Sequence, residues 1–208
     1  MTHVDLAADL LVARDAAARQ RRALEIFKDA GAFLEGHFTY TSGRHGNRYL
    51  EKFRIFERAE HTEPLCRMIA AVFQDSGADL VAGPTTGGII MAYEVGRLLH
   101  LPGIFCEKSD GGRAFRRGFT INPGQRVLVV DDIVTTGGSL QETFTAVESL
   151  GGIIAGVGVL ADRSGGRVTV PYPYFACLEV EFQTWAPEEC PLCASGDAAE
   201  SHRGAQAG

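Results

Sequence analysis

The sequence lacks the features of a nucleic-acid-binding or membrane-spanning protein. Its 20 Lys and Arg are outnumbered by 26 Asp and Glu, which gives a formal net charge of −6. A basic surface is what gathers nucleic acid by releasing counterions, so the charge argues against such a partner. The most apolar stretch, around Val127–Val130, is far shorter than the roughly 20 residues that a membrane-spanning helix needs.

Cysteine is scarce, and a targeting segment is not evident. The five cysteines are odd in number and irregularly spaced, which is typical of reduced thiols rather than of disulfides. The first eleven residues contain Asp5 and Asp9 and have neither a basic start nor a long apolar stretch, unlike a secretory signal. We therefore expect a cytoplasmic protein without a structural disulfide.

What is present is the composition of an ordinary globular protein. Of the 208 residues, 45% are hydrophobic and 22% are charged, a balance that argues against wholesale disorder. A chain of this length can bury a real core and fits one domain with a small attachment.

The pattern of apolar residues predicts an α/β fold. Residues 6–33 have helical spacing, and 37–41 with 48–54 read as a hairpin around the turn-forming residues 42–47. Further along, strands are expected at 80–82, 104–107, 126–131, 153–160 and 175–181, and helices at 63–76, 88–99 and 139–150. This alternation favours βαβ units around a parallel sheet.

We divide the chain into three parts. Residues 1–60 hold the N-terminal helices and the hairpin, and residues 61–186 form the α/β core. Residues 187–208 are rich in Ala, Gly and Ser and hold little apolar bulk, so we expect this tail to be largely disordered.

The stretch with the clearest chemistry follows the aliphatic strand at 126–131. Two acids end the strand and are followed by small and hydroxyl residues: Asp131, Asp132, Ile133, Val134, Thr135, Thr136, Gly137, Gly138 and Ser139. Glycines and short side chains let backbone N–H groups close around a phosphate, and the N-terminus of the next helix favours negative charge there. Carboxylates would repel a phosphate but suit ribose hydroxyls. The stretch therefore predicts a site for a ribose 5-phosphate.

Two other common phosphate-binding signatures are absent from the sequence. Neither the Gly-x-x-x-x-Gly-Lys-Ser/Thr loop of nucleotide hydrolases nor the Gly-x-Gly-x-x-Gly turn of dinucleotide-binding folds is present. A purely structural alternative is a strand followed by a helix with Ser139 as its N-cap, in which the acids are solvated loop residues.

The stretch resembles the phosphoribosyl pyrophosphate signature of type I phosphoribosyltransferases. The resemblance implies that fold and that donor, with Mg²⁺ as cofactor and with Asp131 and Asp132 among the catalytic residues. The family binds pyrophosphate on a second loop, and Thr85, Thr86 and Gly87 occupy the corresponding place here. A plain helix start is the alternative for that second loop.

Two further segments resemble orotate phosphoribosyltransferases. Residues 36–49 are similar to the segment that frames the orotate pocket, which makes the N-terminal part a hood over the acceptor site; a mere hairpin is the alternative. Arg163 stands where the family recognises orotate, with Thr135 beside it, and a guanidinium fork suits a planar anion. A surface ion pair with Asp162 is the alternative for Arg163.

Residues 105–118 resemble the mobile loop that closes over pyrophosphate, often in the neighbouring subunit's site. The resemblance implies a homodimer with shared active sites, a catalytic Lys108, and donor contacts from Arg116 and Arg117. The usual Arg-Lys pair is replaced by Glu107-Lys108, and no histidine occurs between His100 and His202. Thr41 and Gly87 also stand where some relatives carry lysine. A solvated basic loop is the alternative.

Taken together, these segments predict an enzyme of pyrimidine nucleotide synthesis that joins orotate to phosphoribosyl pyrophosphate. A purine phosphoribosyltransferase and a non-catalytic nucleotide-sensing regulator of the same fold are the other candidates. Cys190 and Cys193 are spaced like zinc ligands, but structural zinc takes four ligands and the sequence shows no second pair at matching spacing. We therefore expect no metal centre made of protein ligands.

Overall fold

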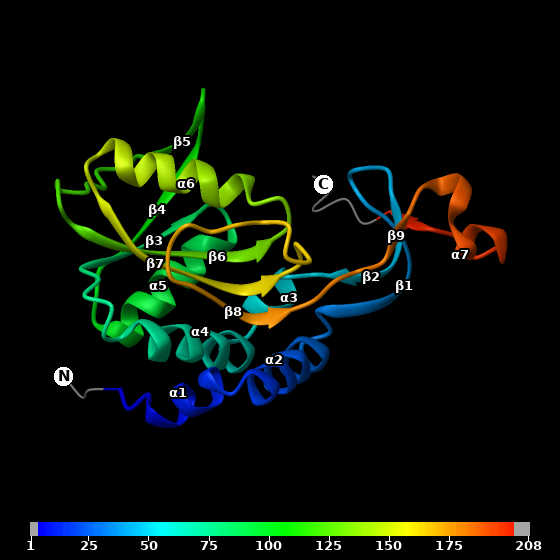
Figure 1. The fold of residues 1–208 in the computed structure, drawn as a ribbon, viewed down its shortest axis with the longest axis horizontal. Helices are drawn as coiled ribbons and strands as arrows, with labels where there is room; N and C mark the ends of the chain where they lie inside the picture. The colour runs from blue at the N-terminus through cyan, green and yellow to red at the C-terminus, as the bar shows by residue number, and fades with distance from the viewer. Residues whose placement is uncertain (1–3, 202–208) are drawn as a thin grey trace.

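The structure is a computed structural model that describes residues 4–201 and contains two sheets (Figure 1). One has six strands in the order β5-β4-β3-β6-β7-β8, and the other has four in the order β10-β1-β2-β9. The strands are β1 (Phe33–Thr39), β2 (His45–Leu50), β3 (Leu80–Pro84), β4 (Gly103–Ser109), β5 (Gly112–Phe115), β6 (Arg126–Val134), β7 (Ile153–Asp162), β8 (Tyr174–Glu179), β9 (Thr184–Trp185) and β10 (Glu200–Ser201). The helices are α1 (Ala7–Arg14), α2 (Ala16–Asp29), α3 (Phe53–Phe56), α4 (Ala59–Phe73), α5 (Gly87–Leu99), α6 (Gly138–Ser149) and α7 (Pro191–Ala194), with a 3-10 turn at Pro187–Glu189.

The six-stranded sheet confirms the predicted parallel α/β core. Its strands β4, β3, β6, β7 and β8 are parallel, and only the edge strand β5 is antiparallel. Successive residues of β6 point to opposite faces. Leu128 and Val130 join the cluster that includes α4 and α5, whereas Val127 and Val129 join the cluster under α6. Helices therefore cover both faces (Figure 1).

The N-terminal helices pack on this core rather than over the hairpin. Asp15 caps α2 by accepting hydrogen bonds from the backbone N–H groups of Ala17 and Ala18, both at 3.0 Å, as favoured at helix N-termini. Both helices lie along the α4 side of the sheet (Figure 1). Of the predicted N-terminal unit, only the hairpin β1–β2 forms the second sheet.

The C-terminal segment differs from the predicted disordered tail. Residues 187–201 form the 3-10 turn, α7 and β10, and together with β9 they lie against the hairpin. Strand β9 pairs with β2 and strand β10 pairs with β1, so residues 184–201 flank the hairpin on both edges. The rest of the predicted tail, residues 202–208, lies outside the described residues.

The segment 105–118, which resembles a mobile loop in sequence, contains regular structure as well. Strand β5 folds back on β4, with Lys108 opposite Arg113 and Ser109 opposite Gly112. Asp110 and Gly111 form the turn, and Gly111 and Gly112 have φ of 95° and 134°, which side chains rarely adopt. The β4–β5 hairpin projects from the sheet (Figure 1). In the part of the chain that the structure describes, no helix is long and apolar enough to cross a membrane.

Candidate active site

The two acids lie inside strand β6, so the structural alternative, in which they are solvated loop residues, is wrong. Asp131 and Asp132 are 5% and 4% exposed. Asp131 accepts a hydrogen bond from the N–H of Asp132 at 2.8 Å. Burial, followed by the adjacent charge of Asp132, raises the pKa of Asp131 to about 7. The pair is a buried, repelling couple of the kind found at functional sites.

Lys52 compensates this charge, although no sequence pattern indicates such a role for it. Its Nζ lies 2.8 Å from Oδ2 of Asp132, and its side chain is 35% exposed. The residue lies between β2 and α3, directly before the first residue of α3. On its other side Asp132 packs against Gly87, where a Cβ would overlap the carboxylate. A residue larger than glycine at position 87 would therefore displace the Asp132 carboxylate.

The predicted phosphate loop joins β6 to α6. Gly137 is the N-cap of α6, with φ of 77° and no side-chain cap, so Ser139 is not the cap that the structural alternative required. Thr135, Thr136 and Gly138 are exposed. The uncapped N-terminus leaves its first backbone N–H groups directed at this loop, which favours an anion.

The second predicted loop lies beside the first. Residues 85–87 join β3 to α5, and the Thr85–Thr86 peptide is cis. Arg113 of β5 bridges the two loops: it donates to the carbonyl of Thr85 at 3.4 Å and to Oγ of Ser139 at 3.1 Å. Its side chain is only 5% exposed and also lies 3.3 Å from Glu142. A buried guanidinium thus sits between the two turns that are predicted to bind anions.

The other cations of the β4–β5 region are placed differently from Arg113. Lys108, Arg116 and Arg117 are exposed. Arg117 pairs with Glu107 at 2.8 Å, which holds the pKa of Glu107 below its usual range. Of the predicted donor contacts, the structure brings residues 131–139 and 85–87 together, whereas these three cations point to solvent within the single chain.

A pocket of about 220 Å³ adjoins the end of β6. Its lining includes Tyr49, Lys52, Ile133, Thr135 and Arg163, so both predicted orotate contacts share one cavity. Side chains from the hairpin, from the β6 end and from the β7 end meet there.

The surroundings of Arg163 argue against the surface ion pair. Its guanidinium lies 5.3 Å from the ring centroid of Tyr40 and 5.5 Å from that of Phe182. Asp162 instead accepts hydrogen bonds from the Ser164 N–H at 2.7 Å and the Tyr174 hydroxyl at 2.8 Å. Within residues 4–201 Arg163 makes no ion pair, so its charge is free for an anionic ligand.

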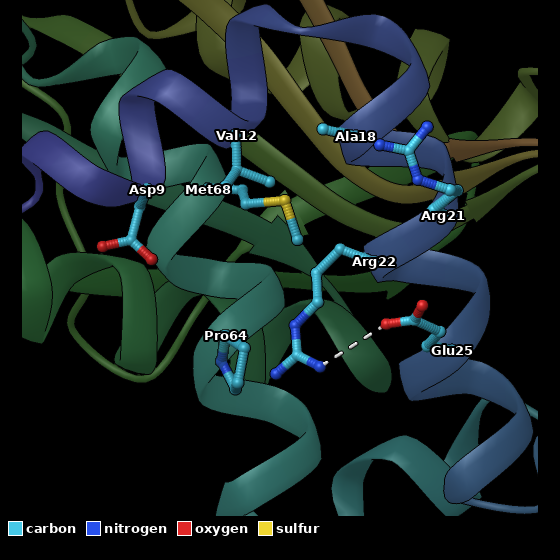
Figure 2. Close-up of a pocket in the computed structure, with 8 residues that line it drawn as sticks. All are labelled: Asp9, Val12, Ala18, Arg21, Arg22, Glu25, Pro64 and Met68. Carbon is cyan, nitrogen blue, oxygen red and sulfur yellow. Dashed lines mark ion pairs between the residues drawn. The ribbon is translucent and has the colours of Figure 1, made fainter.

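A second hollow has no such chemistry. It holds about 340 Å³ among α1, α2 and α4 and is lined by Asp9, Val12, Ala18, Arg21, Arg22, Glu25, Pro64 and Met68 (Figure 2). Arg22 pairs with Glu25 at 3.8 Å, and Asp9 pairs with Arg67 at 2.8 Å. None of the predicted site residues lines this hollow, so the β6 end remains the candidate active site.

The sequence matches the phosphoribosyl transferase domain over residues 65–192. That span covers β3, β6 and the two anion-binding loops just described. It is more than half of the chain, and it defines the class as phosphoribosyltransferase.

Similar curated proteins narrow the class. The orotate phosphoribosyltransferase of Pelotomaculum thermopropionicum is 48% identical over 171 residues, covering 82% of this chain and 90% of that protein. The orotate phosphoribosyltransferase of Chlorobium phaeobacteroides (strain DSM 266) is 46% identical over 173 residues, which cover 83% of this chain and 90% of that protein. The chain therefore belongs to the orotate phosphoribosyltransferase family.

Solved structures support the fold. The orotate phosphoribosyltransferase from Aeropyrum pernix aligns with a TM-score of 0.62 at 24% identity, over 75% of this chain and 92% of that one. An adenine phosphoribosyltransferase from Thermoanaerobacter pseudethanolicus aligns with a TM-score of 0.61 at 21% identity. The alignment covers 76% of this chain and 99% of that one. Because both acceptor types share this fold, the acceptor has to be argued from side chains.

Proposed function

We propose that this chain transfers the 5-phosphoribosyl group of phosphoribosyl pyrophosphate to orotate, giving orotidine 5′-monophosphate and pyrophosphate. One observation carries the choice of acceptor: the pocket that holds the unpaired Arg163 also contains Thr135 of the phosphate loop and Lys52, the partner of Asp132. An anionic planar base bound to Arg163 therefore lies next to the proposed ribose site.

The chemistry is a substitution at the ribose C1. The C1–O bond to pyrophosphate breaks with its electron pair on the leaving group, orotate N1 bonds to the opposite face of C1, and the N1 proton passes to solvent. Positive charge grows on the sugar and negative charge on the leaving group. The carboxylates of Asp131 and Asp132 would hold the ribose hydroxyls and stabilise the positive charge on the sugar. Donors already in place, such as Arg113, would stabilise the negative charge on pyrophosphate. Each such donor contributes about 3 to 4 kcal/mol where measured in other enzymes.

Lys52 makes this arrangement possible. Two adjacent buried carboxylates repel, and burial alone disfavours their ionised form. The ammonium of Lys52, 2.8 Å from the Asp132 carboxylate, supplies an opposite charge that offsets part of this repulsion, while Asp131, whose pKa is raised to about 7, changes charge near neutral pH. We propose that Lys52 is a positioning residue for the acid pair.

The donor set also fits Mg²⁺. The two carboxylates offer hard oxygen ligands, and Mg²⁺ in nucleotide sites is usually held by one or two carboxylates together with substrate phosphates. Because Lys52 already engages Asp132, Asp131 is the residue we propose to face the ion. Bound magnesium would neutralise part of the pyrophosphate charge.

A homodimer with shared sites explains the exposed cations. Lys108 and Arg116 face solvent within one chain, and we propose that in a dimer the β4–β5 hairpin carries them to the partner's pyrophosphate. Mixing an Asp131→Asn/Asp132→Asn variant with a Lys108→Ala variant should then restore activity, because one hybrid site combines intact acids with an intact loop. Random pairing limits recovery to about a quarter of wild type. Activity that stays at the single-variant level after verified subunit exchange would place Lys108 in its own chain's site.

The direct test of the function is a coupled measurement of orotate consumption and pyrophosphate release with purified full-length chain. We expect both to proceed one for one and to require phosphoribosyl pyrophosphate and Mg²⁺. Adenine and hypoxanthine serve as matched acceptors. Faster turnover with either purine would overturn the proposal. Since all substrates are charged and five free thiols suit a reducing compartment, we also propose a cytoplasmic location.

A further inference from the structure

Four potential metal ligands converge where the C-terminal segment crosses the β1–β2 hairpin. They are His37, His45, Cys190 and Cys193, and their ligand atoms all lie within 4.8 Å of one another. Both histidines come from the hairpin, and both cysteines come from the turn and helix between β9 and β10. The hairpin therefore supplies a second pair of candidate ligands that the spacing in the sequence does not reveal.

Four of the six distances among these atoms are close to the edges of a tetrahedron around zinc, and the other two lie within 4.8 Å. The distances are 2.9 Å between His37 Nε2 and His45 Nδ1, 3.4 Å between His37 Nε2 and Cys190 Sγ, 3.7 Å between His37 Nε2 and Cys193 Sγ, and 3.2 Å between His45 Nδ1 and Cys193 Sγ. Tetrahedral zinc with Zn–N near 2.0 Å and Zn–S near 2.3 Å separates two nitrogens by about 3.3 Å, and a nitrogen from a sulfur by about 3.6 Å. Each distance lies within about half an ångström of that geometry.

The outer contacts of the histidines fix which nitrogen faces the cluster. Nδ1 of His37 lies 2.8 Å from the carbonyl oxygen of Asp197, and a carbonyl can only accept. Nδ1 must therefore carry the proton, which leaves the lone pair of Nε2 directed at the other three atoms. His45 places its Nε2 3.4 Å from the hydroxyl of Thr39. Metal-binding histidines are typically oriented by such second contacts.

The segment that carries the cysteines has little else to hold it. Between residues 186 and 200 only Cys190 is buried, and strands β9 and β10 contribute two residues each. A stretch with so little buried apolar surface cannot offset the entropy of ordering its backbone. A metal ion supplies that free energy directly, because its site exists only in the folded chain.

We propose that His37, His45, Cys190 and Cys193 bind one zinc ion that fastens residues 184–201 across the β1–β2 hairpin. Two thiolates and two imidazoles in tetrahedral array favour zinc over the oxygen-preferring ions. All four positions come from the protein, which makes the site structural rather than catalytic. The argument for this site does not rest on the function proposed for the β6 end.

The test begins with the metal content of full-length protein. The chain is produced in zinc-supplemented medium, purified under reducing conditions without a metal-binding tag, and dialysed against metal-free buffer before elemental analysis. We expect one zinc per chain in the wild type. We expect almost none in Cys193→Ser and in His45→Gln. Two controls outside the cluster, Cys66→Ala and His100→Asn, should keep the full content; asparagine tolerates the left-handed backbone of His100, with φ of 58°.

A second measurement covers the case in which a variant fails to fold. Wild-type protein is stripped with a chelator, checked by circular dichroism, and titrated with Co²⁺, whose absorption reports tetrahedral thiolate ligation. Stripped protein should also be cut by protease within residues 184–201 and regain resistance when zinc is added. Wild type without stoichiometric zinc and without a tetrahedral cobalt spectrum overturns the proposal. So does a Cys190–Cys193 disulfide in freshly purified protein, or equal zinc in wild type and both cluster variants.

Discussion

Strand β6 buries Val127, Leu128, Val129 and Val130 completely between two layers of helices, whereas strands β9 and β10 contribute two residues each to the edges of a hairpin. The first arrangement is stabilised by apolar burial, which amounts to roughly 1.5 to 3 kcal/mol for each large side chain. The second depends on a few polar atoms, above all those of His37, His45, Cys190 and Cys193. The phosphate-binding half of the proposed active site therefore rests on the buried strand β6. The acceptor-binding half depends on the β1–β2 hairpin, which residues 184–201 would hold through the proposed zinc site.

Replacing the acids should have the largest effect of all, and it should act on chemistry without unfolding the core. We expect Asp131→Asn with Asp132→Asn to lower turnover by about a hundredfold to a thousandfold, the range for removing preorganised charge at a reacting centre. The isosteric amides remove a buried repulsion, and Lys52, which is 35% exposed, can be solvated. Steady-state turnover and thermal unfolding together check this. A folded variant of near-normal activity would contradict the ribose assignment.

Removing the acceptor arginine should weaken one substrate only. We expect Arg163→Ala to reduce kcat/KM for orotate by about 10- to 100-fold, as for loss of a charged hydrogen-bonding partner, with little change in KM for phosphoribosyl pyrophosphate. Arg167→Ala is the matched control, since its guanidinium lies 3.6 Å from Glu181 in an exposed ion pair. Equal losses for both substrates would mean that Arg163 is structural.

Weakening the contact between residues 184–201 and the β1–β2 hairpin should also weaken orotate binding, but less than the loss of Arg163 does. Tyr40 lies over Arg163 and packs against Gly46, where any side chain would overlap its ring; His45 is the next residue. We therefore expect Cys193→Ser to raise KM for orotate severalfold while leaving KM for the sugar donor unchanged. Initial rates at varied orotate check this. A change in KM for the sugar donor alone would show that the hairpin does not shape the acceptor pocket.

A further expected effect concerns stability and not activity, and it lies in the pH dependence of unfolding. The pKa of Asp131 rises from an ordinary 3.8 to about 7 in the folded state, so the folded chain holds a proton that the unfolded chain has lost. Linkage then makes this residue's contribution to the free energy of unfolding fall as pH rises from about 4 to about 7. Urea unfolding across that interval should show a shallower fall for Asp131→Asn than for wild type. Parallel curves would show that Asp131 ionises normally.

How much the sequence predicts depends on how far apart the interacting residues are. The β6 acids, the phosphate loop and α6 are consecutive, so their arrangement follows from the strand and helix patterns of one stretch. Lys52 and Asp132 are 80 residues apart, and His37 and Cys190 are 153 apart. Neither contact can be predicted from the nearby sequence. The residues next to a lysine or a histidine in the chain are the same whether or not its side chain meets a distant partner. The ordered C-terminal segment was missed for the same reason, since little of it is apolar.

The position of the C-terminal segment on both edges of the hairpin also bears on how the protein is made. Exposed strand edges invite pairing with other chains, and strands β9 and β10 occupy the turn end of both edges. These residues are the last described part of the chain to leave the ribosome. Until they do, β1 and β2 have no partners beyond each other, and the nascent chain has an interval in which it can aggregate or meet a chaperone.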